Sequence, residues 1–159
     1  MNKGVLQKRQ KEKAKYVELG VFMPSYGGSN HGADALGCII SAKPNFVVDL
    51  GCGHNNFIKD LKRKGIEGVG VDFISQQADI IAPMHELPLA DGSADFITAF
   101  DSLEHLIPED VDLVFEEMSR IAMVGKENSF RGRCKKGGKI FDGHLQIKAR
   151  FILEEPNKY

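Results

Sequence analysis

Apolar residues in the middle of the chain fall into short runs that are separated by amphipathic stretches. The run at 46–50 is apolar and β-branched, which is typical of a strand buried on both faces of a sheet. Similar runs at 68–73, 79–82 and 95–100 predict three further strands, and 139–141 predicts a fifth. Five short strands are therefore expected.

The amphipathic stretches predict helices between these strands. Residues 56–64 and 109–122 each place apolar side chains at helical spacing, and Gly65 can end the first of these helices. Acidic residues in the first turn of 109–122 fit the helix dipole. A short helix is expected at 33–41, and residues 1–15 form a polar arm that is compatible with a helix.

Strands that alternate with helices indicate βαβ units and a mostly parallel sheet. We therefore expect an α/β fold of three layers, Rossmann-like, in a single domain over 1–159. Within it, 1–44 form an N-terminal arm and lid, 45–122 a ligand-binding core, and 123–159 an inserted loop at 125–133 and the C-terminal part. Ligands of such sheets bind beyond the carboxyl ends of the strands.

The composition is that of an ordinary soluble domain, with 42% hydrophobic and 27% charged residues among 159. No stretch approaches the roughly 20 apolar residues of a membrane-spanning helix. No apolar block follows the basic N-terminus, so we expect no secretory signal, no membrane partner and a cytoplasmic protein. Three cysteines and five histidines are scattered, which argues against a disulfide framework and a metal site.

Charge is unevenly distributed along the chain. Residues 72–119 contain twelve carboxylates and neither lysine nor arginine, while both ends are basic. These acids either form solvated faces and helix-terminal caps or line a pocket that accepts a cation. The basic cluster at 131–139 lacks the interleaved aromatic residues of a single-strand binder, so we do not expect a nucleic-acid partner.

A glycine-rich turn follows the first strand. Gly51 and Gly53 let the backbone approach a ligand closely, and Asn55 tolerates a positive φ. Asp72 ends the second strand nineteen residues after Gly53, where a carboxylate can accept the hydroxyl hydrogens of a ribose. The turn alone is also compatible with a purely structural role, but together with Asp72 it indicates a nucleoside ligand.

The turn departs from the dinucleotide pattern G-x-G-x-x-G. Asn56 stands at the position of the third glycine, so a dinucleotide such as NAD fits poorly. Asp49, two positions before the first glycine, is placed to face an ammonium group directly or through water. A capping or turn-bonding role is equally compatible with its position.

Four segments in the same order resemble the class I S-adenosylmethionine-dependent methyltransferases, and most of all the small-molecule branch. They are residues 47–55 (VVDLGCGHN), 70–73 (GVDF), 86–96 (ELPLADGSADF) and 99–106 (AFDSLEHL). The resemblance lies within 46–122, about half of the chain. It implies S-adenosylmethionine as the cofactor and a sheet with the strand order 3-2-1-4-5.

The resemblance also implies how the donor is held. Asp49 and the glycine turn would line its methionine part, and Asp72 would hold the ribose. Phe73 would pack on the adenine, the backbone amide of Met84 would meet the base edge, and Phe100 with the next residue would close the floor near the sulfonium. The full set is Asp49, Gly51, Cys52, Gly53, Asp72, Phe73, Met84, Phe100 and Asp101.

Two departures from the family pattern bear on these expectations. Relatives commonly carry an acidic residue where Pro83 stands, so weaker base contacts are expected. The family sheet normally has seven strands, but the residues beyond Gly143 leave room for one short element at 146–155, so we expect a shortened C-terminus with the last two strands reduced or absent. A free edge of the fifth strand would then favour a homo-oligomer unless a loop covers it.

His105, just beyond the fourth strand, is the candidate catalytic residue, either as a general base or as a group that caps and orients the following helix. Residues 26–31 form either an exposed linker or a lid over the bound ligands. We expect a methyltransferase that acts on a small-molecule acceptor. The alternative is a shortened S-adenosylmethionine-binding module that is non-catalytic or depends on a partner.

Overall fold

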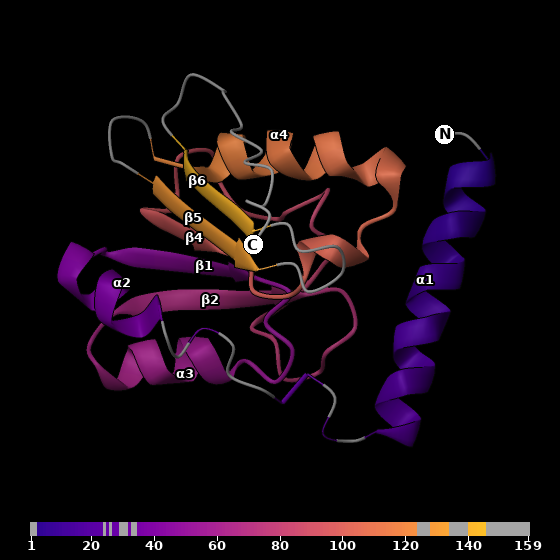
Figure 1. The fold of residues 1–159 in the computed structure, drawn as a ribbon, viewed down its shortest axis with the longest axis horizontal. Helices are drawn as coiled ribbons and strands as arrows, with labels where there is room; N and C mark the ends of the chain where they lie inside the picture. The colour runs from indigo at the N-terminus through magenta and orange to yellow at the C-terminus, as the bar shows by residue number, and fades with distance from the viewer. Residues whose placement is uncertain are drawn as a thin grey trace, which may run out of the picture.

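The structure, a computed structural model, describes residues 3–23, 25, 27–28, 32, 35–123, 128–133 and 140–145. Its centre is a parallel four-stranded sheet in the order β3-β2-β1-β4 (Figure 1). The strands are β1 (Phe46–Leu50), β2 (Glu67–Asp72), β3 (Ile80–Ile81) and β4 (Phe96–Thr98). All four lie where the hydrophobic runs predicted strands, and their expected order is confirmed.

Parallel pairing brings the carboxyl ends of β1, β2 and β4 to one edge of the sheet. Asp49 lies opposite Gly70 on one neighbouring strand and opposite Thr98 on the other. β1 is buried from Val47 to Leu50, as expected for a central strand that helices cover on both faces. Residues that close the three strands therefore meet at a common edge, which we call the carboxyl edge.

Helices cover both faces of the sheet, as Figure 1 shows. α2 (Leu36–Ala42) and α3 (Asn56–Arg63) lie on one face, where their buried side chains pack with Val47. α4 (Val111–Ile121) lies on the other face and packs with Val48. Because successive residues of a strand point to opposite faces, β1 contributes to both halves of the core. The predicted three-layer α/β fold is confirmed.

The ends of the core helices show what local sequence can specify. Gly65, beyond the end of α3, has a φ of 78°, the left-handed conformation predicted for it. α4 begins at Val111 and not at 109 as predicted, because η3 (Pro108–Asp110) precedes it as a 3-10 turn. The proline fixes φ and cannot donate a backbone hydrogen bond, which suits the first turn of such a helix.

The N-terminal arm is a long helix, α1 (Lys3–Phe22), which stands beside the carboxyl edge (Figure 1). The helix suggested for 1–15 therefore continues through the apolar stretch that follows. One stripe of α1 is less exposed than the rest and consists of Val5, Arg9, Glu12, Tyr16 and Leu19. Neither α1 nor any other described helix is long and apolar enough to cross a membrane.

Two later strands, β5 (Asn128–Arg133) and β6 (Ile140–Leu145), form an antiparallel hairpin in a sheet of their own. Residues 128–133 of the predicted loop at 125–133 therefore form a strand, so the prediction was wrong for that part. This segment is polar and contains a glycine, so it lacks apolar alternation, and pairing with β6 supplies the partners of its backbone. Residues 140–141 of the predicted fifth strand belong to β6, and the element expected at 146–155 lies outside the described residues.

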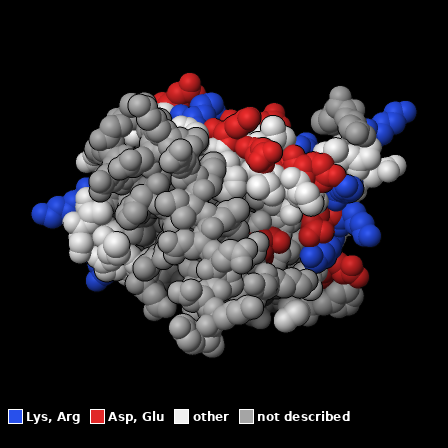
Figure 2. Space-filling model, turned by 45° about the horizontal axis from the view of Figure 1, so that its top comes forward, with Lys and Arg blue, Asp and Glu red and all other residues white. Residues whose placement is uncertain are grey.

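Acidic side chains gather along one side of the molecule, next to basic side chains of α1 (Figure 2). Some of them, such as Glu116 of α4, are exposed and form a solvated face. Others are buried with structural partners. Asp95 accepts the backbone amides of Asn45 and Phe46 at 2.6 and 3.1 Å, and Asp110 pairs with Arg9. Both groups belong to the acidic stretch found in the sequence.

Candidate functional site

The turn after β1 is held against the end of β2. The backbone amides of Gly51 and Cys52 both donate to the carbonyl of Val71, at 2.8 and 3.1 Å. Gly51 and Gly53 have φ values of 77° and 53°, which residues with side chains rarely adopt. Asn55 has a φ of 60°, as its position in the turn predicted.

Gly51 also leaves room for two other segments. A Cβ atom at this position would lie 2.4 Å from Cβ of Ser102 and 3.0 Å from Cε of Met84. Ser102, which follows β4, donates its hydroxyl to the carbonyl of Leu50 at 2.9 Å. The end of β1, the segment after β4 and the turn that contains Met84 therefore meet at Gly51.

Asp49 is an acidic residue in the interior of the sheet, where it is 4% exposed. The hydroxyl of Thr98, on β4, donates to its carboxylate at 2.7 Å. Burial raises the pKa of Asp49 to about 7, against the hydrogen bond from Thr98 and with a smaller contribution from the charge of Asp72. A cationic ligand group would favour the ionised form of Asp49.

Asp72 closes β2 and faces the glycine turn. Its Oδ2 accepts the backbone amide of Gly53 at 3.1 Å, and its Oδ1 accepts those of Ile74 and Ser75 at 3.0 and 2.9 Å. A carboxylate has about four acceptor positions, so three backbone donors fix its orientation and leave about one for a ligand. Asp72 thus lies beside the turn, as its spacing predicted, and its role toward a ribose stays a prediction.

The turn that contains Met84 is tied to the same edge of the sheet. The amide of Ala82 donates to the carbonyl of Asp72 at 3.0 Å. The amide of Glu86 donates to the carbonyl of Pro83 at 3.1 Å and closes the turn. We call residues 83–86 the Met84 turn.

Three aromatic rings meet between α1 and the carboxyl edge. The ring of Tyr16 lies edge-on to those of Phe73 and His105, with centroid distances of 5.5 and 5.3 Å. Tyr16 is buried, whereas the side chain of His105 is 40% exposed and its Nε2 lies 4.0 Å from Glu104. His105 belongs to η2 (Leu103–His105), a 3-10 turn beyond β4, and its catalytic role stays a prediction.

Phe100 and Asp101 follow β4 at the same edge. Phe100 packs edge-on against Phe57 of α3 with a centroid distance of 5.0 Å, so its ring contributes to the core on that face. Asp101 has a φ of 46°, which marks a sharp change of direction after the strand. The resemblance expects both residues to form the floor of the site, and that role stays a prediction.

Part of the loop between α1 and α2 is bound to the glycine turn. The amide of His54 donates to the carbonyl of Gly27 at 2.9 Å, and the side chain of Asn56 donates to that of Gly28 at 2.7 Å. A Cβ atom at Gly53 would lie 2.4 Å from the carbonyl oxygen of Gly27. These two loop residues therefore cover the turn, and the rest of the predicted lid lies largely outside the described residues.

Asp79, immediately before β3, binds both the glycine turn and β2. It accepts the side-chain amide of Asn55 at 2.8 Å and the backbone amide of Gly70 at 2.9 Å. Although burial opposes ionisation, hydrogen bonds from Gly70, Asn55 and Lys62 hold the pKa of Asp79 below its ordinary value. Asp79 thus serves the fold by joining the turn to β2.

Within the described ranges, no group of three or more histidine, cysteine, aspartate or glutamate residues could hold a metal ion. His85 lies 3.5 Å from Asp110. Burial lowers the pKa of His85, although the charge of Asp110 opposes this shift. His144 lies in β6, and His31 lies outside the described residues.

Three residues of the site were missed by sequence reasoning, namely Tyr16, Thr98 and Ser102. Thr98 carries a usable signal, because a polar residue in an apolar strand needs a buried partner, which proves to be Asp49. Tyr16 and Ser102 carry none. Tyr16 reaches the site only through the docking of α1, and Ser102 only through the close approach that Gly51 permits.

A family model described as a methyltransferase domain matches residues 48–125. A protein of Pyrococcus horikoshii has a similar structure, with a TM-score of 0.56 at 21% identity over 72% of this chain and 65% of its own. A protein of Anabaena variabilis that is attributed to an antibiotic biosynthesis pathway as a methyltransferase gives a TM-score of 0.52 at 19% identity, over 62% of this chain and 44% of its own. This chain thus spans less than two thirds of the length of either protein.

The 1,6-didemethyltoxoflavin-N1-methyltransferase of Burkholderia thailandensis, solved with 1,6-didemethyltoxoflavin and S-adenosylhomocysteine, gives a TM-score of 0.64 at 12% identity over 91% of this chain and 71% of its own. A search of curated protein sequences found no match. The structural likenesses establish the fold, and the family match covers the glycine turn, Asp72 and the Met84 turn. Residues 48–125 therefore match a methyltransferase domain, and the chain has the Rossmann-like fold of these solved structures.

Proposed function

We propose that the chain binds S-adenosylmethionine at the carboxyl edge of β1, β2 and β4 and transfers the methyl group to a small-molecule acceptor. The observation that carries this proposal is the pair of carboxylates that flank the glycine turn. Asp49 is buried beside Thr98, and Asp72 is fixed by three backbone amides. A cationic amine and a ribose hydroxyl are ligand groups that suit these two environments.

The remaining residues of the edge suit the rest of the donor. Ionised Asp49 would hold the ammonium group, and Asp72 would accept one ribose hydroxyl directly. Phe73 would pack against the adenine, whose edge would meet the backbone amide of Met84. The turn residues Gly51 to Gly53 would line the methionine part, and the two residues after β4 would form the floor.

When bound, S-adenosylmethionine supplies a methyl group on a positively charged sulfur, which is already an activated leaving group. The chain then has to align the acceptor and exclude water, and such positioning contributes roughly 7 to 11 kcal/mol in favourable cases. The docked Gly27 and Gly28 and the buried ring of Tyr16 suit a covering role. His105 would act as a general base where the acceptor is a hydroxyl group.

Two observations support a small-molecule acceptor. The stretch at 87–96 resembles the small-molecule branch of the family. The Burkholderia thailandensis enzyme with the same fold was solved with a small heterocycle, 1,6-didemethyltoxoflavin.

A second candidate function is a donor-binding module that depends on a partner protein. It is supported by the likeness to a chain of the complex between a Haloferax volcanii methyltransferase activator and a methyltransferase, with a TM-score of 0.50 at 23% identity over 64% of this chain and 51% of that chain. In that case the isolated chain would bind S-adenosylmethionine but would not transfer its methyl group.

Titration calorimetry with S-adenosylmethionine, S-adenosylhomocysteine and NAD tests donor binding. We expect the first two to bind and NAD to fail, and tight binding of NAD alone would overturn both candidate functions. Incubation with methyl-labelled donor and a metabolite extract then separates the two. Label in a small product supports the enzyme, whereas donor binding without transfer supports the partner-dependent module.

A further inference from the structure

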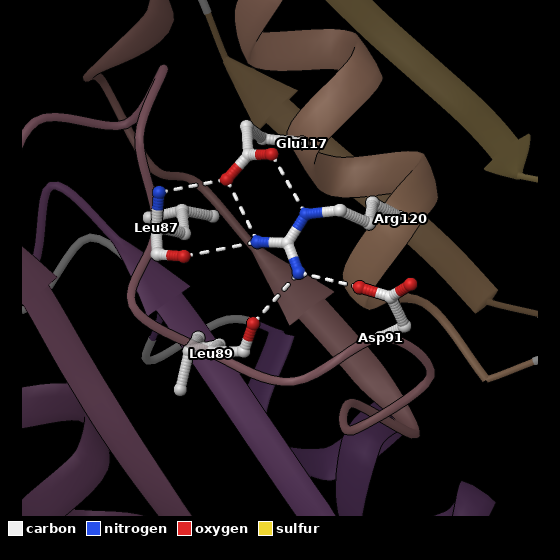
Figure 3. Close-up of polar contacts among 5 residues, drawn as sticks. All are labelled: Leu87, Leu89, Asp91, Glu117 and Arg120. Carbon is white, nitrogen blue, oxygen red and sulfur yellow. Dashed lines mark hydrogen bonds and ion pairs between the residues drawn. The ribbon is translucent and has the colours of Figure 1, made fainter.

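The segment after the Met84 turn is held by two side chains of α4, Glu117 and Arg120 (Figure 3). Arg120 donates to the backbone carbonyls of Leu87 and Leu89 at 2.9 and 2.7 Å, and to Asp91 at 2.7 Å. It also forms two hydrogen bonds with Glu117, at 2.7 and 2.8 Å. Glu117 in turn accepts the backbone amide of Leu87 at 2.7 Å.

These contacts use the full hydrogen-bonding capacity of the guanidinium. Its Nε takes one acceptor, and Nη1 and Nη2 take two each, which accounts for all five N–H groups of an arginine. Arg63 offers a contrast on α3, because it forms an exposed pair with Asp60 at the same i,i+3 spacing. An arrangement that binds both the N–H and the carbonyl of Leu87 fixes the backbone of that residue.

Leu87 directly follows the Met84 turn, and the other end of the turn is fixed as well. There the amide of Ala82 donates to the carbonyl of Asp72 at 3.0 Å. Leu87 itself is 5% exposed, so its side chain adds a packing anchor to the polar one. The Met84 turn is thus held between the end of β2 and the Glu117–Arg120 pair.

This matters for the ligand because Pro83 has neither a backbone N–H nor a polar side chain. Pro83 therefore cannot bond the adenine amino group, and the base contact that the resemblance gives this turn is the backbone amide of Met84, which meets a base only while the turn keeps its place. We infer that Glu117 and Arg120 are positioning residues for adenine recognition, since they hold the Met84 turn where its backbone meets the base edge. This inference rests on the proposed function.

The test compares two ligands that differ only in the base, S-adenosylhomocysteine and S-inosylhomocysteine, whose hypoxanthine lacks the 6-amino group. In calorimetry, Arg120→Gln should lose about tenfold of the wild-type preference for the adenine ligand, equivalent to about one good hydrogen bond. Arg63→Gln, which removes the exposed pair on α3, should keep the wild-type preference. If Arg120 had a purely structural role, Arg120→Gln would weaken the binding of both ligands equally, and that result would overturn the inference.

Arg120→Lys serves where Arg120→Gln fails to fold, because lysine keeps the charge but cannot bind all of these acceptors at once. We expect it to lose part of the preference and to speed amide hydrogen exchange at 84–87 in the ligand-free protein. If both the amide hydrogen exchange at 84–87 and the preference for the adenine ligand stayed unchanged in this variant, the inference would be wrong. If the wild type binds neither ligand, the proposed function is wrong, and the exchange measurement still decides whether the pair holds the turn.

Discussion

At the scale of single residues, the site contains two aspartates with opposite surroundings. Asp72 receives three backbone amides, whereas Asp49 is buried with the Thr98 hydroxyl as its donor. Desolvation of a carboxylate disfavours its charged form unless enough donors or a cation compensate. The two residues are therefore suited to different ligand groups, and their substitution should have different consequences.

Asp49→Asn is expected to raise the melting temperature at about pH 8 and to leave it nearly unchanged at about pH 4. Because burial raises the pKa of Asp49 from 3.8 to about 7, the folded protein keeps a proton that the unfolded chain releases. The stability linked to this group is complete below about pH 4 and is lost as the pH rises through about 7. Thermal melts of both proteins across this range measure the effect.

Glu116→Gln, at an exposed position on α4, is the control and should shift the melting temperature little at either pH. The same Asp49 variant should bind S-adenosylmethionine at least about tenfold more weakly at pH 8, since the ligand cation loses its charged partner. A melting temperature that changes equally at both pH values would contradict the assigned ionisation of Asp49.

Asp72→Ala should weaken binding of S-adenosylhomocysteine by about tenfold to a hundredfold, as expected for the loss of a hydrogen bond to a charged group worth ~1.5–3 kcal/mol. The loss also releases the backbone amides of Gly53, Ile74 and Ser75 that the carboxylate holds. Calorimetry measures the affinity, and circular dichroism checks that the variant is folded. Unchanged affinity in a folded variant would show that the ribose lies elsewhere.

At the scale of elements, contacts between residues distant in sequence attach α1 to the body. Nε of Arg9 donates to both carboxylate oxygens of Asp110 at 3.0 Å, across 101 residues of chain. Lys8 pairs with Glu109 beside it, and Tyr16 packs on Phe73. The helix stands beside the carboxyl edge (Figure 1), so its docking shapes one wall of the site.

Arg9→Ala should loosen α1, because it leaves the buried carboxylate of Asp110 without its arginine. The expected loss of stability is ~2 kcal/mol, below the range for a fully buried pair because Arg9 is partly exposed. Hydrogen exchange of the α1 amides should accelerate while that of β1 stays as in the wild type. Lys13→Ala, at an exposed position on the same helix, is the control, and equal exchange in both variants would show that the pair does not hold the helix.

At the scale of the whole molecule, the described strands fall into two sheets. The four-stranded sheet carries the site, and the hairpin of β5 and β6 pairs within itself. A strand edge presents backbone donors and acceptors that favour pairing with another chain. The strand edges of this architecture therefore bear on its assembly state.

A free strand edge favours a homo-oligomer unless a loop covers it, and on that basis we expect self-association. Light scattering coupled to size exclusion, run at two concentrations about tenfold apart, should show a mass above that of one chain that rises with concentration. A single-chain mass at both concentrations would contradict this prediction.

Much of the core and the turn could be predicted because the signals are local. The apolar run at 46–50 matches β1 to the residue, and Gly65 takes the left-handed conformation expected of a helix end. β5 could not be predicted, because its polar segment takes strand form by pairing with β6 and has no pattern of its own. The role of the Glu117–Arg120 pair could not be predicted for the same reason, since the backbone carbonyls that accept from Arg120 lie about thirty residues away in the sequence.

The sequence by itself determined the order of the strands and α-helices from β1 to α4, the backbone of the glycine turn and the place of Asp72 at the end of β2. Hydrophobic periodicity and allowed φ values act over a few residues, so they can be read without the fold. Only the tertiary structure decided that Tyr16 reaches Phe73, that Arg120 holds Leu87, and that Asp49 is buried deeply enough to shift its pKa. These properties depend on desolvation and on contacts between distant segments, which exist only once the chain has packed.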